Sequence, residues 1–160
     1  MDFQLDEEQR LVRDMVRDFA QKELAPRAAE VDRTEEFPAE NIRKIAELGL
    51  MGLPYPEEVG GGGGDYLSYA IVVEEIARAC GATALIYAAH VSLGCGLIYY
   101  FGTPEQKLRW LPRLCSGQGL GAFGLTEPEA GSDAGATRTT AVRDGDHYIL
   151  NGSKMWITSG

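Results

Sequence analysis

The chain has 160 residues, of which 44% are hydrophobic and 24% charged, a composition typical of a soluble globular protein with a substantial core. Its net charge of -9 argues against nucleic acid and anionic membranes as partners, because phosphate groups are bound by clustered Lys and Arg. The three cysteines are widely spaced and the acidic N-terminus lacks a signal-peptide pattern, so we expect a cytoplasmic protein without disulfides or a metal site.

The first third of the chain is predicted to be helical. Apolar residues recur at three- and four-residue spacing over residues 5–32, which predicts a long amphipathic helix that Pro26 kinks or breaks. A second helix is expected after Phe37, with Pro38 at its first position and Gly49 just beyond its end.

Five consecutive glycines, Gly60 to Gly64, follow the second predicted helix. A flexible surface loop is favoured over a phosphate-binding loop, because the latter adds Lys-Ser/Thr at a helix start and Asp65 stands there instead. A third helix is expected from Tyr66 to Arg78, and Glu74 and Glu75 lie off its apolar stripe. The residues of that stripe are Tyr69, Val72, Val73 and Ile76.

A span without Asp, Glu, Lys or Arg extends from Cys80 to Pro104 and is long enough to cross a bilayer. Glycines and polar residues interrupt it, so a buried helix over residues 82–101 in a helical core is the better interpretation. His90 within it is interpreted as a hydrogen-bonded core residue rather than a catalytic one.

The pattern changes from helical to strand-like near Gly117. Before it, Thr103, Pro104 and Gln106 have the spacing of a capping box and predict a fifth helix that Gly117 ends. After it, alternating residues predict strands at Ala136–Arg143, His147–Leu150 and Lys154–Thr158, with a hairpin turn at Asp144-Gly145. The chain is therefore predicted to be α+β, with an all-α domain over residues 1–118 and the first strands of a β-domain over residues 119–160.

Two motifs near the C-terminal end carry chemistry. The turn Thr126–Asp133 offers hydroxyl groups and glycine-exposed N–H groups, which suit a polar ring edge or a pyrophosphate, and it equally suits a purely structural turn. Trp156 and Thr158 place an aromatic face and a hydroxyl close together, although a tryptophan taken alone is more often a core residue.

The two motifs together resemble a known family. Residues 124–136, GLTEPEAGSDAGA, look like the first signature of the acyl-CoA dehydrogenases, and residues 151–160, NGSKMWITSG, look like the segment that follows it. The resemblance extends upstream through residues 48–52, LGLMG, to the N-terminus and covers essentially the whole chain. It implies a helical domain followed by the start of a β-barrel-like domain.

The resemblance also implies FAD as cofactor and the oxidation of acyl-CoA to trans-2-enoyl-CoA, as in fatty acid β-oxidation. Gly131 and Ser132 are expected at the FAD pyrophosphate, with Ser132 also near the acyl-CoA. The residues expected along the flavin ring are Phe123, Leu125, Thr126, Trp156, Ile157 and Thr158. The expected acyl-pocket residues are Ile86, Ala89 and Leu93, which share a helix face and suit core packing equally well.

No catalytic residue is assigned within the chain. In the family, the glutamate of the turn, here Glu127, is structural, and the catalytic base lies in a C-terminal helical domain. The 160 residues are therefore expected to be an inactive portion of a homotetramer that passes electrons to electron-transfer flavoprotein. The alternatives are another flavoenzyme of the same fold, an acyl-CoA oxidase or a monooxygenase, and a non-enzymatic helical module.

Overall fold

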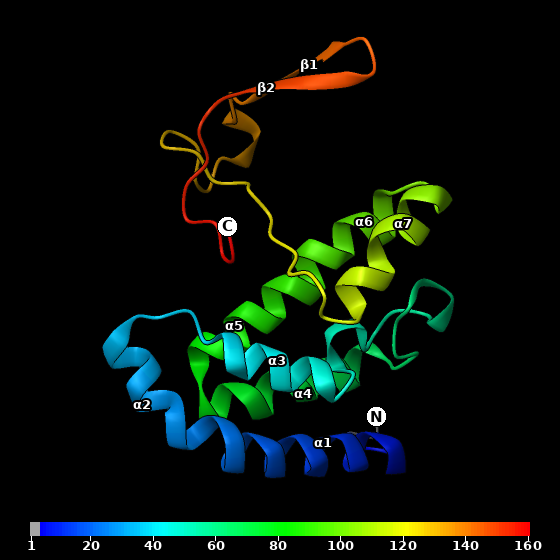
Figure 1. Cartoon of the computed structure of the whole chain (residues 1–160), viewed down its shortest axis with the longest axis vertical. Helices are drawn as coiled ribbons and strands as arrows, with labels where there is room; N and C mark the ends of the chain where they lie inside the picture. The colour runs from blue at the N-terminus through cyan, green and yellow to red at the C-terminus, as the bar shows by residue number, and fades with distance from the viewer. Residues whose placement is uncertain (1–3) are drawn as a thin grey trace. The chain divides into compact units, whose positions relative to one another are not determined.

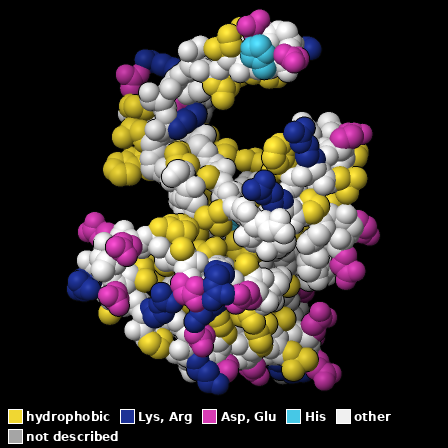
Figure 2. All heavy atoms as spheres, in the orientation of Figure 1, with side chains coloured by type: hydrophobic (Ala, Val, Ile, Leu, Met, Phe, Trp, Pro, Cys, Tyr) yellow, Lys and Arg dark blue, Asp and Glu magenta, His cyan; other side chains and the backbone are white. Residues whose placement is uncertain are grey.

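The computed structural model describes residues 4–160, which divide into a helical unit ending at Gly121 and a second unit over Ala122–Gly160. Helices make up the first unit, and the second contains a two-stranded antiparallel sheet (Figure 1). This confirms the α+β class. On the face drawn in Figure 2, Lys and Arg are interspersed with Asp and Glu over the helical unit rather than gathered in one basic patch.

The N-terminal helix is continuous but changes its pitch. It consists of α1 (Glu7–Phe19), a π-helical turn (Ala20–Leu24) and α2 (Ala25–Thr34). Pro26 lies in the first turn of α2, where its missing N–H and fixed φ are tolerated. The predicted kink is therefore present as a wider turn and not as a break.

The connection from α3 (Ala39–Glu47) to α4 (Tyr66–Ala79) contains 3-10 turns at Leu50–Gly52 and Glu57–Val59. Pro38 is the N-cap of α3 and not its first residue, so the helix begins one residue later than predicted. The glycine run that follows is hydrogen-bonded: the N–H groups of residues 61–64 donate to the carbonyls of Pro56, Gly52, Tyr55 and Leu53. The N–H of Gly60 donates to the carbonyl of Glu57, so all five amides of the run are paired with carbonyls, which excludes a phosphate cradle and shows an ordered turn.

The uncharged span forms the central helix of the first unit. It comprises α5 (Gly81–Ala88), a π-helical turn (Ala89–Cys95) and α6 (Gly96–Phe101), and α7 (Pro104–Cys115) follows with the predicted capping box. By length and composition, Gly81–Phe101 is the one helix within residues 4–160 that could cross a membrane. Just over half of it is buried inside the protein, however, which fits the predicted core helix better.

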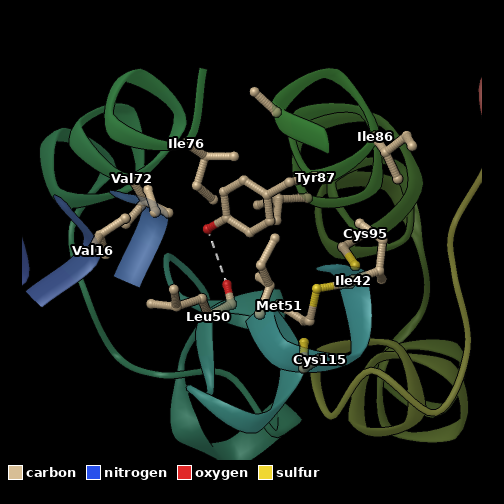
Figure 3. Packing of buried hydrophobic residues seen from close by; sticks show 14 of the residues in the cluster. Val16, Ile42, Leu50, Met51, Val72, Ile76, Ile86, Tyr87, Cys95 and Cys115 are labelled. Atoms are coloured by element: carbon tan, nitrogen blue, oxygen red, sulfur yellow. Dashed lines mark hydrogen bonds between the residues drawn. The ribbon is translucent and has the colours of Figure 1, made fainter. Parts of the chain in front are cut away.

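The core is built around Tyr87, which points from α5 toward the 3-10 turn after α3 (Figure 3). Its hydroxyl donates to the carbonyl of Leu50 at 3.0 Å, and its ring lies among Val16, Val72, Ile76 and other buried side chains. Burying such apolar side chains provides the main stabilisation of the helical unit.

The apolar stripe predicted for α4 packs against the core, and one residue off the stripe is buried as well. Val72 and Ile76 are buried as predicted, but Tyr69 and Val73 are only half-buried. Glu75, off the predicted stripe, is nevertheless buried because the Arg17 guanidinium of α1 donates to both of its carboxylate oxygens, at 2.6 and 3.0 Å. Apolar spacing alone could not reveal this pair, since its two members are 58 residues apart.

The second unit contains the hairpin of β1 (Thr140–Asp144) and β2 (His147–Asn151). Its two-residue turn is Gly145-Asp146, one position later than predicted, and Gly145 supplies the positive φ of 63° that the turn requires. A 3-10 turn at Ala134–Ala136 precedes β1, so the first strand starts later than predicted. The predicted strand at Lys154–Thr158 is wrong, because Trp156 has a φ of 58°, which no extended strand accommodates.

Candidate functional site

Two segments of the second unit lie side by side and bring the two sequence motifs together. The N–H of Met155 donates to the carbonyl of Thr126 at 2.8 Å, and the ammonium of Lys154 donates to the carbonyl of Leu125 at 3.0 Å. A β-carbon on Gly124 would make ordinary contacts with Lys154 Cγ and Ile157 Cδ1, at 3.4 and 3.5 Å, so the two segments lie against each other at this point. The motif residues separated in sequence are therefore neighbours in space.

Glu127 joins three parts of this unit. Its buried carboxylate accepts from the N–H groups of Arg138 and Thr139, at 2.6 and 3.0 Å, and from the ammonium of Lys154 at 2.8 Å. The amide of Arg138, then Lys154 and Thr139, lower the pKa of Glu127 to about 2. A carboxylate with both oxygens occupied and so low a pKa holds the unit together and cannot act as a general base near neutral pH.

The turn after Glu127 leaves hydrogen-bond donors free. Glu127 and Ala130 exchange two backbone hydrogen bonds, at 3.0 and 3.2 Å, which close the turn. The N–H groups of the next two residues, Gly131 and Ser132, have no partner within residues 4–160, and both residues are exposed. A β-carbon on Gly131 would meet nothing within 4 Å. Successive free N–H groups at an open turn are suited to an anion such as a pyrophosphate.

The predicted ring-binding residues of the first segment lie next to this turn. Phe123 and Thr126 are half-buried, and Leu125 is exposed. The hydroxyl of Thr126 has no partner within the described part of the chain, whereas its carbonyl is held by Met155. The backbone at Thr126 is therefore fixed while its side chain can still bind a ligand.

Trp156 is the most unusual residue of the second segment. Its side chain is 85% exposed and its φ of 58° is in the left-handed region, where a bulky residue is strained. Ser159, with a φ of 62°, shares that conformation, and Ile157 and Thr158 between them are half-buried. A large aromatic side chain held in a strained and exposed position gains nothing for folding, which favours a ligand-contacting role over the core role that a lone tryptophan suggests.

The predicted acyl-pocket residues belong to the helical unit. Ile86 and Ala89 are buried, and Ile86 is part of the hydrophobic core, whereas Leu93 is 43% exposed. The π-helical turn that begins at Ala89 has a wider pitch than an α-helix. Seven-residue spacing therefore does not place Leu93 on the helix face of Ile86 and Ala89.

Two features of the site were not predicted from the sequence. The ion pair of Lys154 with Glu127 carries no local signal beyond a lysine in a Gly-Ser turn. The left-handed backbone at Trp156 has no local signal either, because tryptophan is not a residue that favours this conformation. Within residues 4–160, no group of His, Cys, Asp and Glu side chains could hold a metal ion.

Comparison with known proteins identifies two family models along the chain. The model of the acyl-CoA dehydrogenase N-terminal domain matches residues 6–118, and that of the acyl-CoA dehydrogenase middle domain matches residues 122–160.

Curated relatives match the chain over nearly its whole length. A probable acyl-CoA dehydrogenase of Bacillus subtilis is 60% identical over 99% of this chain and 42% of its own. A short-chain specific acyl-CoA dehydrogenase of Clostridium acetobutylicum is 55% identical over 100% of this chain and 42% of its own. An acryloyl-CoA reductase (NADH) of Anaerotignum propionicum is 49% identical over 100% of this chain and 41% of its own. The chain thus spans about two fifths of the length of these relatives.

Solved structures agree with these matches. A chain in a structure described as the electron transferring flavoprotein of Acidaminococcus fermentans has a TM-score of 0.96 and 49% identity, covering 100% of this chain and 42% of its own. Butyryl-CoA dehydrogenase from Megasphaera elsdenii has a TM-score of 0.94 and 43% identity, covering 100% of this chain and 43% of its own. An acyl-CoA dehydrogenase complexed with FAD from Bacillus anthracis has a TM-score of 0.89 and 39% identity, covering 96% of this chain and 27% of its own.

Proposed function

Because the chain belongs to the acyl-CoA dehydrogenase family, we propose that the full-length protein oxidises short-chain acyl-CoA thioesters to trans-2-enoyl-CoA with FAD. The observation that carries this proposal is the pairing of the segment around Thr126 with the segment around Trp156 through the Met155–Thr126 and Lys154–Leu125 hydrogen bonds. It brings an aromatic face, free hydroxyls and free N–H groups into one small unit.

The residues present fit a flavin. A flavin ring needs a flat apolar neighbour and hydrogen-bond donors at its polar edge, and its pyrophosphate needs further hydrogen-bond donors. Trp156 is exposed, the hydroxyl of Thr126 is free, and the N–H groups of Gly131 and Ser132 are unpaired within residues 4–160. The one buried carboxylate of this unit, Glu127, is neutralised by Lys154.

FAD, when bound, supplies the acceptor for the hydride equivalent that leaves the β-carbon of the substrate. The residues of the chain itself bind FAD and orient its ring. The hydroxyls of Thr126 and Thr158 donate to polar ring atoms, while Phe123, Leu125, Trp156 and Ile157 line the ring. Gly131 and Ser132 hold the pyrophosphate, and these contacts fix the ring against movement.

We propose that the acceptor of the substrate's α-proton lies outside residues 4–160. Glu127 has a pKa of about 2 and three donors, and His90 is buried with its Nδ1 already accepting a hydrogen bond. We therefore assign residues 4–160 to cofactor and substrate binding and expect the base to be contributed from outside them.

The substrate class rests on the relatives whose names include short-chain specific acyl-CoA dehydrogenase and butyryl-CoA dehydrogenase. In this proposal, Ser132 of the second unit contacts the acyl-CoA. Turnover of butyryl-CoA against octanoyl-CoA tests the chain length.

Electron-transfer flavoprotein is the proposed electron acceptor, and the proposed assembly is a cytoplasmic homotetramer. The similarity to a chain in a structure described as an electron transferring flavoprotein supports the first of these. The acceptor is tested by reduction of purified electron-transfer flavoprotein under anaerobic conditions, the assembly by light scattering, and the location by cell fractionation.

Threonine-to-alanine variants of the full-length protein provide the main test. Thr126→Ala and Thr158→Ala are each expected to weaken FAD binding about tenfold by removing a hydrogen bond to the ring. Thr140→Ala is the matched control, because Thr140 is an exposed residue of β1. Unchanged FAD binding in both site variants would favour a non-enzymatic helical module.

The reaction itself separates this proposal from other flavoenzymes. Rapid reoxidation of the reduced flavin by oxygen would indicate an acyl-CoA oxidase or a monooxygenase. A specific alternative is suggested by the relative named acryloyl-CoA reductase (NADH). NADH-dependent reduction of acryloyl-CoA without detectable butyryl-CoA oxidation would replace the proposed direction of catalysis by the reductive one.

A further inference from the structure

His90 makes a hydrogen bond that no role in the proposed chemistry requires. It lies on the π-helical turn Ala89–Cys95, its side chain is fully buried, and its Nδ1 accepts from the N–H of Gly121 at 2.8 Å. A backbone amide can only donate, so Nδ1 carries the lone pair and the ring hydrogen is on Nε2, 3.5 Å from Cys95 Sγ. Burial lowers the pKa of His90, which keeps the ring in this neutral form.

A second contact holds the same point of the chain. A β-carbon on Gly94 would lie 2.6 Å from Gly121 Cα, and one on Gly121 would lie 2.8 Å from Gly94 Cα. Both glycines are buried, and their backbones touch directly. His90 and Gly94 are one turn apart, so the π-helical turn holds Gly121 by a hydrogen bond and by close packing at once.

The π-helical turn is itself secured by neighbouring side chains. The hydroxyl of Tyr55 donates to the carbonyl of Val91 at 2.6 Å, and those of Tyr69 and Ser92 donate to the carbonyl of Ala88 at 3.2 and 2.6 Å. These bonds satisfy carbonyls at a turn of irregular pitch, where π-helical geometry often marks a functional site. Gly121 is therefore attached to a rigid support.

Gly121 is the last residue of the helical unit, and the predicted ring-binding residues begin two positions later, at Phe123. We infer that His90 is a positioning residue, which, with Gly94, fixes the point from which the flavin-binding segment leaves the helical unit. This inference rests on the proposed function. It assigns His90 no contact with substrate or FAD, because the residue acts through the amide of Gly121.

The test compares two substitutions of His90 in the full-length holoenzyme. His90→Asn keeps an acceptor oxygen near the position of Nδ1, whereas His90→Leu leaves the Gly121 amide buried without a partner. We expect His90→Leu to raise the dissociation constant of FAD about tenfold and to shift its visible absorption bands, and His90→Asn to stay within about twofold of the wild type. Equal losses in both variants would show that only the ring volume matters and would overturn the inference.

A glycine pair keeps the inference falsifiable if His90→Leu does not fold. Gly94→Ala places a methyl group against Gly121, and Gly81→Ala is the control in the same continuous helix, because its β-carbon would meet nothing within 4 Å. Alanine is a better helix former than glycine, so neither change weakens the helix itself. We expect Gly94→Ala to raise the dissociation constant of FAD several-fold and Gly81→Ala to leave it unchanged; equal values would overturn the inference.

The wild-type protein distinguishes this inference from the proposed function. If the wild type binds no FAD, the proposed function fails and the inference falls with it. If the wild type binds FAD and oxidises butyryl-CoA while His90→Leu and Gly94→Ala match it, the inference alone fails.

Discussion

Lys154 and Glu127 are 27 residues apart, and the ammonium of the first lies 2.8 Å from a carboxylate oxygen of the second. The same ammonium also holds the carbonyl of Leu125. One lysine therefore links the segment that carries Trp156 to the turn that carries Thr126. Because the backbone amides of Arg138 and Thr139 complete the carboxylate's bonding, the arrangement depends on Glu127 being ionised.

The first prediction concerns acid stability. The folded-state pKa of Glu127 is about 2, below the value of about 4.3 for an unfolded glutamate, so its ionisation stabilises the fold above about pH 4. That contribution is lost as the pH falls from about 4 to about 2. Glu127→Gln should lower stability at pH 7 and flatten its pH dependence in this window, as measured by urea unfolding of the full-length protein.

Glu129→Gln is the matched control for that experiment. Glu129 lies two residues away in the same turn, but its side chain is 66% exposed and its partner Arg138 is exposed as well. Glu129→Gln should leave the acid limb, the loss of stability between about pH 4 and about pH 2, unchanged. A Glu127→Gln protein with the acid limb of the wild type would show that the carboxylate contributes nothing to folding.

The second prediction concerns Glu75, which is buried against Arg17. Hydrogen bonding and charge from Arg17 lower the pKa of Glu75, so this pair stabilises the fold above about pH 4 and loses that effect on acidification. Glu75→Gln should cost about 1–2 kcal/mol at pH 7, measured by urea denaturation. The exposed neighbour Glu74, 3.9 Å from Arg78, should tolerate the same change within about 0.5 kcal/mol.

The third prediction concerns the glycine run. A β-carbon on Gly61 would lie 2.1 Å from the carbonyl oxygen of Tyr55, whereas one on Gly62 would come no closer than 3.3 Å to Leu53. Gly61→Ala should therefore cost about 2 kcal/mol or more, and Gly62→Ala less than about 1 kcal/mol. The comparison of their urea midpoints decides between an ordered turn and a flexible loop, since a flexible loop would tolerate both equally.

The elements whose signals are local could be predicted from the sequence. Thr103 and Gln106 exchange the two capping bonds that their spacing indicates, so the start of α7 is as predicted. The apolar interior of Gly81–Phe101 likewise indicates a core helix. Interactions between residues close together in the chain produce local sequence patterns, and such patterns predict structure.

The details that long-range contacts impose could not be predicted in this way. The π-helical turn Ala89–Cys95 lies in a charge-free span whose sequence predicts a regular helix, and the side chains of Tyr55 and Tyr69 that bond carbonyls in and just before the turn come from elsewhere in the chain. The burial of Glu75 depends on Arg17. The left-handed conformation at Trp156 comes directly after the bond from Met155 to the distant Thr126, and the expected strand there does not form.

The fourth prediction uses the strain at Trp156 to separate folding from binding. The left-handed conformation costs an L-residue about 1–2 kcal/mol, and glycine adopts it freely at an entropic cost of about 0.5–1 kcal/mol in the unfolded chain. Because the side chain is 85% exposed, little burial is lost on its removal. Trp156→Gly should therefore keep or raise the free energy of unfolding, by up to about 1 kcal/mol, while weakening FAD binding about tenfold or more.

Ser159→Gly is the control for this prediction, because Ser159 has a φ of 62° in the same segment and no predicted contact with the flavin. It should give the same gain in stability without loss of FAD binding, as measured by urea unfolding and FAD titration of the full-length protein. Stability that rises while binding falls is expected only where a strained residue is kept for its ligand. If Trp156→Gly lost stability and binding together, the indole would be a structural side chain of the second unit, and its place beside the flavin would have to be given up.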